Sequence, residues 1–280
     1  MVPSSPKARG LALIAVLIVA LIGFFAVKYS AGNKLAKALE NRVLVIVMEN
    51  NFGVPEELSS LYDENKENID AILAFVFKTE KENMAGMGLA EVIDAYGEDY
   101  LADRFKKAAK GYGEVVVLTD GQASYGNFEE TLVSLNEKGK TVDILLDLHG
   151  GPDEICFYED CVDNDWMEFM VSMRSSEPLN IGFVYQTLCY GGQNMEPWLK
   201  MGAKAANGAE GLNNFVVIAP EKFLRSWTNG DGFAEAVEKG YSLELSVDKI
   251  MSKIFPGYSL TEESVNSGRM LFLGNKNYSL

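Results

Sequence analysis

The stretch LLDLHGG, residues 145–151, is an apolar run that ends on the only histidine of the chain, His149, and then on two glycines. A second apolar run, IGFVYQTLCYGG at residues 181–192, ends in the same way on Cys189. Each run is typical of a buried strand that turns on glycine at its carboxyl end. If the two strands are parallel neighbours, the imidazole and the thiol meet at one edge of the sheet, where open α/β sheets place their sites. A cysteine nucleophile and its base require such a meeting.

Apolar, β-branched segments alternate with helical segments along the rest of the chain. Continuous apolar character at 43–48 indicates a strand covered on both faces, and therefore a parallel sheet. The expected strands are 43–48, 115–118, 142–148, 181–188, 215–218 and 270–273, and the expected helices lie within 56–112 and at 127–136, 163–173, 195–206 and 232–239. This alternation predicts a three-layer α/β/α sandwich with a mostly parallel central sheet over residues 42–280, with a helical insertion within 56–112.

Residues 1–31 are typical of a membrane anchor. Leu11 to Val27 is a run of 17 apolar or glycine residues, and a helix of that length reaches roughly 25 Å, at the short end of what spans a bilayer. A cleaved signal peptide is the alternative, but Tyr29 stands two positions before Ala31, so no small-x-small cleavage site follows the run cleanly. We therefore expect a single-pass membrane protein held by an uncleaved N-terminal helix.

The charges near the apolar run and the cysteines indicate on which side of the membrane the globular domain lies. Lys7 and Arg9 precede the apolar run and three lysines follow it, so the positive-inside rule is nearly balanced. A short N-terminal tail usually stays in the cytoplasm, which predicts an extracytoplasmic globular domain. Cys156 and Cys161 are spaced for a small-loop disulfide in an oxidising compartment, which favours the same side. Three unpaired cysteines are an equal alternative, because connectivity cannot be read from sequence.

Composition limits the classes of ligand. The chain carries 40 acidic and 25 basic side chains, a net charge of −15, and such a surface repels the phosphates of nucleic acids. The same charge attracts cationic partners or simply maintains solubility, and we favour solubility. Nucleotide-binding glycine motifs are absent from the sequence, a single histidine argues against zinc, and the acidic residues of 160–165 fail the EF-hand spacing. We expect no cofactor and no metal.

The two glycine-ended runs resemble the motifs of the caspase–legumain–gingipain clan of cysteine peptidases. That clan is marked by an apolar strand ending in His-Gly and a second ending in Cys before a small-residue turn, which match His149-Gly150 and residues 189–192. Leu188 stands where many members have Ala or Asp, and Leu148 stands where legumains have Asp. The resemblance therefore extends to the clan, and we assign no family within it.

This resemblance implies a role for each residue. Cys189 is expected to be the nucleophile and His149 its general base, with the backbone N–H groups of Gly150 and Cys189 as the oxyanion hole. Asp147 shares the strand face of His149 and is a candidate for orienting the imidazole or binding a basic substrate side chain, although a solvated strand-end carboxylate is favoured. Ser226 and Trp227 lie where clan members pair with extended substrates, but Trp227 is equally well explained as a packing aromatic.

The sequence thus predicts a membrane-anchored cysteine endopeptidase that acts on peptide or protein substrates through a thioester on Cys189. A catalytically silent domain of the same fold, tethered to a membrane to bind a partner, is the alternative from another class. A transpeptidase using the same two residues is a third possibility, because the difference lies only in which nucleophile reaches the thioester.

Overall fold

The computed structural model describes residues 38–49, 56–174, 177–213, 218–254 and 261–280. The chain contacts divide into two units: one holds residues 51–101 and 247–259 together with 1–29, and the other holds 30–50, 102–246 and 260–280. The expected anchor at 1–31 and most of the expected strand at 215–218 lie outside the described residues. No helix in the described part of the chain is long and apolar enough to cross a bilayer.

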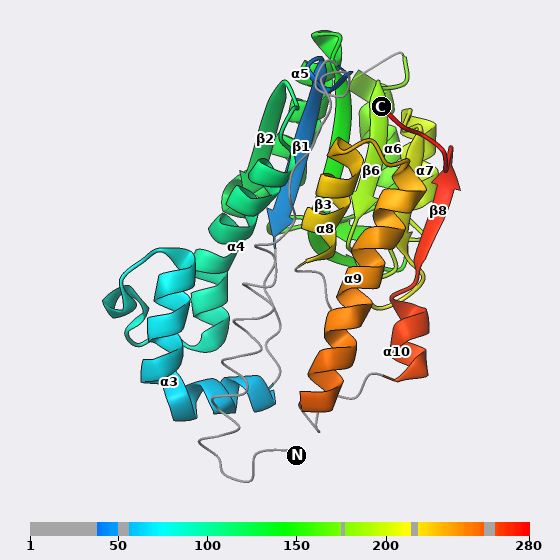
Figure 1. The fold of residues 1–280 in the computed structure, drawn as a ribbon. Helices are drawn as coiled ribbons and strands as arrows, with labels where there is room; N and C mark the ends of the chain where they lie inside the picture. The colour runs from blue at the N-terminus through cyan, green and yellow to red at the C-terminus, as the bar shows by residue number, and fades with distance from the viewer. Residues whose placement is uncertain (1–37, 50–55, 175–176, 214–217, 255–260) are drawn as a thin grey trace. The chain divides into compact units, whose positions relative to one another are not determined.

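The second unit is built on a mostly parallel sheet (Figure 1). Its strands follow one another in space in the order β2-β1-β3-β6-β7-β8, and only the last pair, β7 and β8, is antiparallel. Their bounds are β1 (Arg42–Glu49), β2 (Glu114–Thr119), β3 (Thr141–Gly151), β6 (Ile181–Gln186), β7 (Ala205–Ala209) and β8 (Met270–Gly274). Two short strands, β4 (Glu154–Cys156) and β5 (Cys161–Asp163), continue from β3 as an antiparallel hairpin.

The central strands are buried on both faces, as their continuous apolar sequences predict. Residues 43–48 of β1 are all fully or nearly fully buried, and β1 pairs in parallel register with both β2 and β3. On one face, Val45, Ile144 and Leu146 pack in a single cluster with the helical side chains Phe128, Met167 and Trp198. On the other face, Phe183 contacts the rings of Phe223 and Phe233, with ring centroids 5.2 and 5.4 Å away.

Helices therefore cover both faces and complete the three layers that the alternating sequence predicts. The first face carries α5 (Tyr125–Glu137), α6 (Asn164–Arg174) and α7 (Met195–Met201). The second carries α8 (Ala219–Thr228) and the beginning of α9 (Phe233–Ile254), which belongs to this unit up to residue 246. The unit also contains the end of α4 (Leu89–Ala108) and two short elements, η2 (Asp120–Ala123) and α10 (Glu262–Ser267). The helix expected from Asn127 begins earlier, because the side chain of Ser124 accepts a hydrogen bond from the Asn127 N–H and caps α5.

The expected helix 195–206 is wrong in its second half. α7 ends at Met201 on the left-handed Gly202, with φ 118°, and the chain then forms β7. The sequence of β7, AANGA, contains no β-branched residue, so it lacks the usual composition of a strand. All five of its residues are buried, and pairing with β6 and β8 compensates for the weak local preference.

A buried ion pair joins β1 to β3 at the amino ends of the strands. Arg42 donates to both carboxylate oxygens of Asp143, and Tyr112 donates to the same carboxylate at 2.7 Å. Asp143 is fully buried, so these donors replace the water that a carboxylate needs. The neighbouring Gly182 has no room for a side chain, since a β-carbon there would overlap the Arg42 guanidinium and the Asp143 carboxylate.

The first unit is helical in its described part. It contains α3 (Glu56–Phe77), η1 (Lys81–Met84), the beginning of α4 (Leu89–Ala108) and the end of α9 from residue 247. Tyr62, Ile69, Leu73, Met84 and Val92 form its apolar cluster. Lys66 connects α3 to the segment after η1, because its Nζ donates to the carbonyl oxygen of Met87 at 2.7 Å and to the hydroxyl of Tyr62 at 2.5 Å.

Candidate functional site

His149 and Cys189 lie at the carboxyl ends of two neighbouring parallel strands, as the two glycine-ended runs predict. β3 pairs with β6 through Leu145 opposite Tyr185 and Leu146 opposite Gln186. The ladder continues past the end of β6, because the Thr187 N–H donates to the Leu146 carbonyl at 3.0 Å. Three residues further along β3 stands His149, whose side chain is exposed, and two residues beyond Thr187 stands the half-buried free thiol of Cys189.

Gly150 is the point at which the two segments touch. A β-carbon at residue 150 would lie 2.9 Å from the Cys189 carbonyl oxygen and 3.0 Å from the β-carbon of Leu188. Both distances are too short for an ordinary side chain, so this contact requires glycine. The backbone that follows the histidine is therefore packed directly against the backbone of the cysteine.

The loop at residues 211–213 holds the thiol. The backbone N–H of Asn213 donates to Cys189 Sγ at 3.4 Å, and its carbonyl oxygen lies 3.8 Å from the same sulfur. The side-chain amide of Asn213 donates to the Thr187 carbonyl at 2.9 Å, and the Tyr190 N–H donates to the Gly211 carbonyl at 2.7 Å. The backbone of Asn213 therefore fixes the position of the sulfur.

The turn after the thiol has an unusual backbone. Tyr190 has a positive φ of 55°, a conformation that side-chain-bearing residues rarely adopt and that is found at functional sites. The sheet holds this turn in place through two hydrogen bonds. The side chain of Gln186 in β6 donates to the Gly191 carbonyl, and the Gly192 N–H donates to the Ala209 carbonyl of β7 at 2.8 Å. Gly208 of β7 has no room for a β-carbon beside Gly191. The small residues of β7 thus allow the cysteine turn to lie against the sheet.

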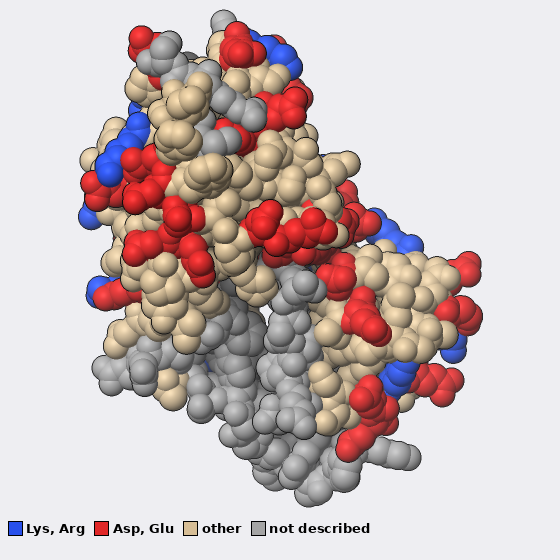
Figure 2. All heavy atoms as spheres, turned by 180° about the vertical axis from the view of Figure 1, so that it is seen from behind, with Lys and Arg blue, Asp and Glu red and all other residues tan. Residues whose placement is uncertain are grey.

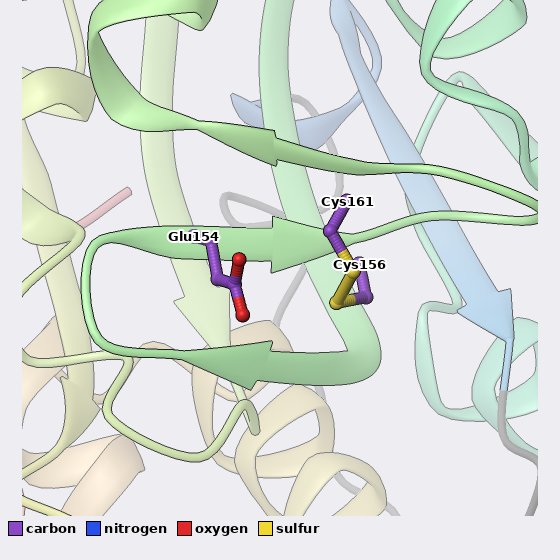
Figure 3. A group of neighbouring side chains, drawn as sticks. All are labelled: Glu154, Cys156 and Cys161. Carbon is purple, nitrogen blue, oxygen red and sulfur yellow. A yellow bond between two sulfur atoms is a disulfide. The ribbon is translucent and has the colours of Figure 1, made fainter.

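The hairpin of β4 and β5 extends from the histidine. His149 lies directly opposite Cys156, and Cys156 lies directly opposite Cys161. The two cysteines are joined in a disulfide, the first of the two arrangements that the sequence left open (Figure 3). Glu154 lies beside them and, among the described residues, completes the one group of three potential metal ligands. Because both sulfur atoms are in the disulfide, neither is the thiolate that a metal would bind.

Two buried asparagines connect this hairpin to the cysteine turn. Asn194 is fully buried, and its side-chain amide donates to the carbonyl oxygen of Glu154 in β4 at 3.2 Å. Its side-chain oxygen accepts a hydrogen bond from Asn164, at the start of α6, at 3.0 Å. The His149 segment and the Cys189 turn are therefore fastened together by side chains as well as by the contact at Gly150.

Asp147 lies beneath the site and is not the solvated carboxylate that the sequence favoured. Only 1% of the residue is exposed, and Oδ1 accepts a hydrogen bond from the Thr187 hydroxyl at 2.8 Å. Burial raises the pKa of the neighbouring Tyr185, and the negative charges of Glu244 and Asp147 raise that pKa further. Tyr185 of β6 thus has two carboxylates near its hydroxyl. A role of Asp147 in substrate binding stays a prediction.

Ser226 and Trp227 lie in α8, and both are buried. Trp227 meets the ring of Phe183 edge to face and stacks on the ring of Tyr278, and its Nε1 donates to the Tyr112 hydroxyl at 2.9 Å. Tyr112 in turn binds Asp143, which lies six residues before His149 on β3 and hence about 20 Å from it along the strand. The packing interpretation of Trp227 fits these contacts, and the substrate-binding role of both residues is not supported by an exposed surface.

Asn213, Asn194 and Asn164 were not among the residues expected from the sequence. Each lies in or beside a loop with other polar residues next to it, and nothing in its local pattern separates it from a solvated turn residue. Their partners lie 24 to 40 positions away along the chain, since Asn213 reaches Cys189 and Asn194 reaches Glu154. Only the folded sheet brings them to the site.

The structure is similar to the crystal structure of gingipain R (RGPB), which is described as an Arg-specific cysteine proteinase. The TM-score is 0.48 with 10% sequence identity, and the match covers 99% of this chain and 54% of that chain, so this chain spans about half the length of that protein. This likeness concerns the overall fold alone. No family model and no curated protein matches the sequence. The fold and the site define an α/β protein with a histidine and a free cysteine at one sheet edge.

Proposed function

We propose that this chain is a cysteine endopeptidase in which Cys189 is the nucleophile and His149 the general base. The observation that carries the proposal is the contact between the backbones of Gly150 and Cys189 at the carboxyl edge of β3 and β6. That contact holds an exposed imidazole and a free thiol on adjacent segments, which a nucleophile and its base require.

The reaction proceeds through an acyl-enzyme. His149 takes the proton of the Cys189 thiol, and the sulfur attacks the peptide carbonyl carbon to form a tetrahedral oxyanion. The backbone N–H groups of Gly150 and Cys189 are the proposed donors to that oxyanion. When the C–N bond breaks, the imidazolium returns its proton to the departing amine and a thioester remains on Cys189. Water, deprotonated by His149, then hydrolyses the thioester and restores the thiol.

Asn213 supports the first step by placing its backbone N–H on Sγ at 3.4 Å. Its side chain is anchored to Thr187, so the donor remains in place while the proton leaves the sulfur. Asp147 stands on the same strand two residues before His149, and its buried carboxylate is the proposed group that orients this strand end. In this proposal residues 1–31 hold the catalytic domain at a membrane, on its extracytoplasmic side, where an oxidised Cys156–Cys161 pair is stable.

The test compares the full-length chain with its Cys189→Ala and His149→Ala variants on a library of internally quenched peptides, in the presence of a mild reductant. Cleavage by the parent and loss of at least 1,000-fold in both variants, with unchanged circular dichroism, is the expected result. An unaltered rate in Cys189→Ala would overturn the proposal. Absence of cleavage by a folded parent would favour a catalytically silent binding domain.

The matched control is Asn229→Ala, a substitution at an exposed residue just after α8. It removes a polar side chain outside the proposed site and should leave turnover unchanged. Trapping of the parent, but not of Cys189→Ala, by a peptide aldehyde would identify the sulfur that forms the covalent bond.

A further inference from the structure

Helix α6 exposes large apolar side chains to solvent. Trp166, Phe169 and Met173 are 46%, 50% and 70% exposed. Their spacing of three and four residues places them on one face of the helix. The rings of Trp166 and Phe169 contact each other, with centroids 5.8 Å apart. A contiguous apolar face of this kind marks an interaction site more often than an isolated exposed residue does.

A cavity adjoins this face through Trp166. Its volume is about 390 Å³, and its lining includes Tyr125 at the start of α5, Cys161 of β5 and Trp166. That volume lies in the range of ligand cavities, about 300–1,000 Å³. The helix face and the cavity therefore form one continuous surface, wide enough to accept a side chain of a bound peptide beside the indole of Trp166.

Carboxylates surround the surface. Asp160 and Asp163 line the cavity and are exposed, and Asp165 is exposed in the first turn of α6. The nearby lysine of α7, Lys200, is engaged by Glu168 and Glu196. Acidic side chains also greatly outnumber basic ones on the face of the molecule seen in Figure 2. With a net charge of −15, a second copy of this chain and an anionic membrane are both repelled from an acid-rimmed surface.

We propose that this α6 surface, defined by Trp166, Phe169, Met173, Asp160 and Asp163, binds a peptide segment of another protein. The segment presents an aromatic or long aliphatic side chain flanked by Lys or Arg. The apolar side chain enters the cavity beside Trp166, and the flanking cations meet the carboxylates of Asp160 and Asp163. Cations also bind favourably over indole and phenyl rings, which Trp166 and Phe169 provide.

The surface is connected to the His149 site by the hairpin. Cys161 lines the cavity, its disulfide partner is Cys156, and Cys156 lies directly opposite His149. Strand β4 thus lies between the strand that lines the cavity, β5, and the strand that carries the histidine, β3. The inference does not depend on catalysis, because it rests on the apolar face, the cavity and the charges alone.

The natural fluorescence of the chain makes the proposal testable. Of the three tryptophans, Trp198 and Trp227 are fully buried and Trp166 alone is exposed. The probe is the acetylated and amidated peptide Lys-Phe-Lys-Leu-Arg, titrated into the full-length Cys189→Ala chain, which cannot cleave it. We expect saturable binding with a change in tryptophan emission and with protection of Trp166 from acrylamide quenching. The acidic peptide Glu-Phe-Glu-Leu-Glu should bind at least tenfold more weakly.

Variants measured by calorimetry separate this surface from others. Phe169→Ala should weaken binding of the basic peptide about tenfold, as loss of an aromatic contact at an interface does. Asp160→Asn should weaken it several-fold at low salt and less at high salt. Phe75→Ala is the matched control, because Phe75 is also an exposed aromatic but lies in the other unit, on α3, and its loss should leave binding unchanged.

Three results would overturn the proposal. The first is no saturable binding of the basic peptide, and the second is equal affinity for the basic and acidic peptides. The third is self-association of the chain that Phe169→Ala abolishes, because the occupant would then be a second copy. The substituted side chains are exposed, so these variants are expected to keep the parent's thermal unfolding midpoint.

Discussion

The carbonyl oxygen of Cys189 lies 2.9 Å from the position that a β-carbon at Gly150 would occupy. This one contact joins the segment after the histidine to the turn that carries the thiol. It also makes the His-Gly sequence a packing requirement, independent of any role of the Gly150 N–H group.

Gly150→Ala is therefore expected to separate the two segments. The added methyl group meets the Cys189 carbonyl, Leu188 and the Glu154 carbonyl, so the backbone has to shift. Overpacking of this kind costs about 1–3 kcal/mol of the free energy of unfolding, and a displacement of about 1 Å at a catalytic pair lowers kcat roughly 100-fold. Urea unfolding and peptide turnover measure the two effects. Gly126→Ala in α5 is the control, since nothing lies within 4 Å of its β-carbon.

Asn213→Leu should lower the reactivity of the thiol. Leucine has a similar size but lacks the amide that donates to the Thr187 carbonyl, so the Asn213 backbone N–H is no longer fixed on Sγ. We expect kcat/KM and the rate of alkylation by iodoacetamide at neutral pH to fall together, by about tenfold. Stability should fall by only about 1 kcal/mol, the usual contribution of one hydrogen bond.

Asn180→Ala controls for the general loss of an amide contact. The Asn180 side chain donates to the Thr141 hydroxyl at 2.9 Å, at the amino end of β3 and far along the strand from His149. Its loss should leave alkylation unchanged. If Asn213→Leu were alkylated as fast as the parent, Asn213 would have no part in holding the thiol.

Removing the disulfide should loosen the hairpin beside His149. In the double variant Cys156→Ser, Cys161→Ser the unfolded chain regains the freedom of a short loop, a loss of about 2 kcal/mol of stability in the chain-entropy description. Strands of three residues have little other support, so amide hydrogen exchange should increase across residues 154–163 first. Turnover should fall because the hairpin that pairs with His149 becomes looser.

A reductant that opens the disulfide should likewise increase amide exchange and lower turnover in the parent, and it should change neither in the double variant. This comparison separates the disulfide from Cys189, which reducing conditions keep active. If amide hydrogen exchange and turnover were unchanged in the double variant, the disulfide would not be needed to hold the hairpin. The hydrogen bond from Asn194 and the apolar core would then be sufficient.

Gly182→Ala should disrupt the ion pair at the other end of the strands. The new methyl group would overlap the Arg42 guanidinium and the Asp143 carboxylate, which are both largely removed from water. Breaking a buried pair destabilises by about 3–5 kcal/mol. The thermal midpoint should drop by more than 5 °C, whereas Gly232→Ala, whose β-carbon meets nothing closer than 3.9 Å, should be nearly silent. A Gly182→Ala chain as stable as the parent would show that the pair adapts.

The sequence by itself determined the parallel sheet and the position of the two reactive residues. The apolar, β-branched segments of β1, β3 and β6 have enough local character to form buried strands, and parallel neighbours bring their carboxyl ends to one edge. The placement of His149 and Cys189 follows from that rule without any knowledge of contacts. The same rule did not predict β7, because its small residues are not typical of a strand. They are small because the backbone of Gly191 packs directly against β7 at Gly208.

Only the tertiary structure decided the surroundings of the site. Asn213, Asn194 and the buried state of Asp147 depend on contacts between segments 24 to 40 positions apart, which no local pattern contains. Trp227 illustrates the same limit, since an aromatic residue after a strand is equally consistent with a substrate platform and with the core until its neighbours are known. The apolar pattern of a segment decides which secondary structure it forms, because that pattern must be buried. Which polar groups become hydrogen-bond partners is decided by the geometry of the assembled sheet.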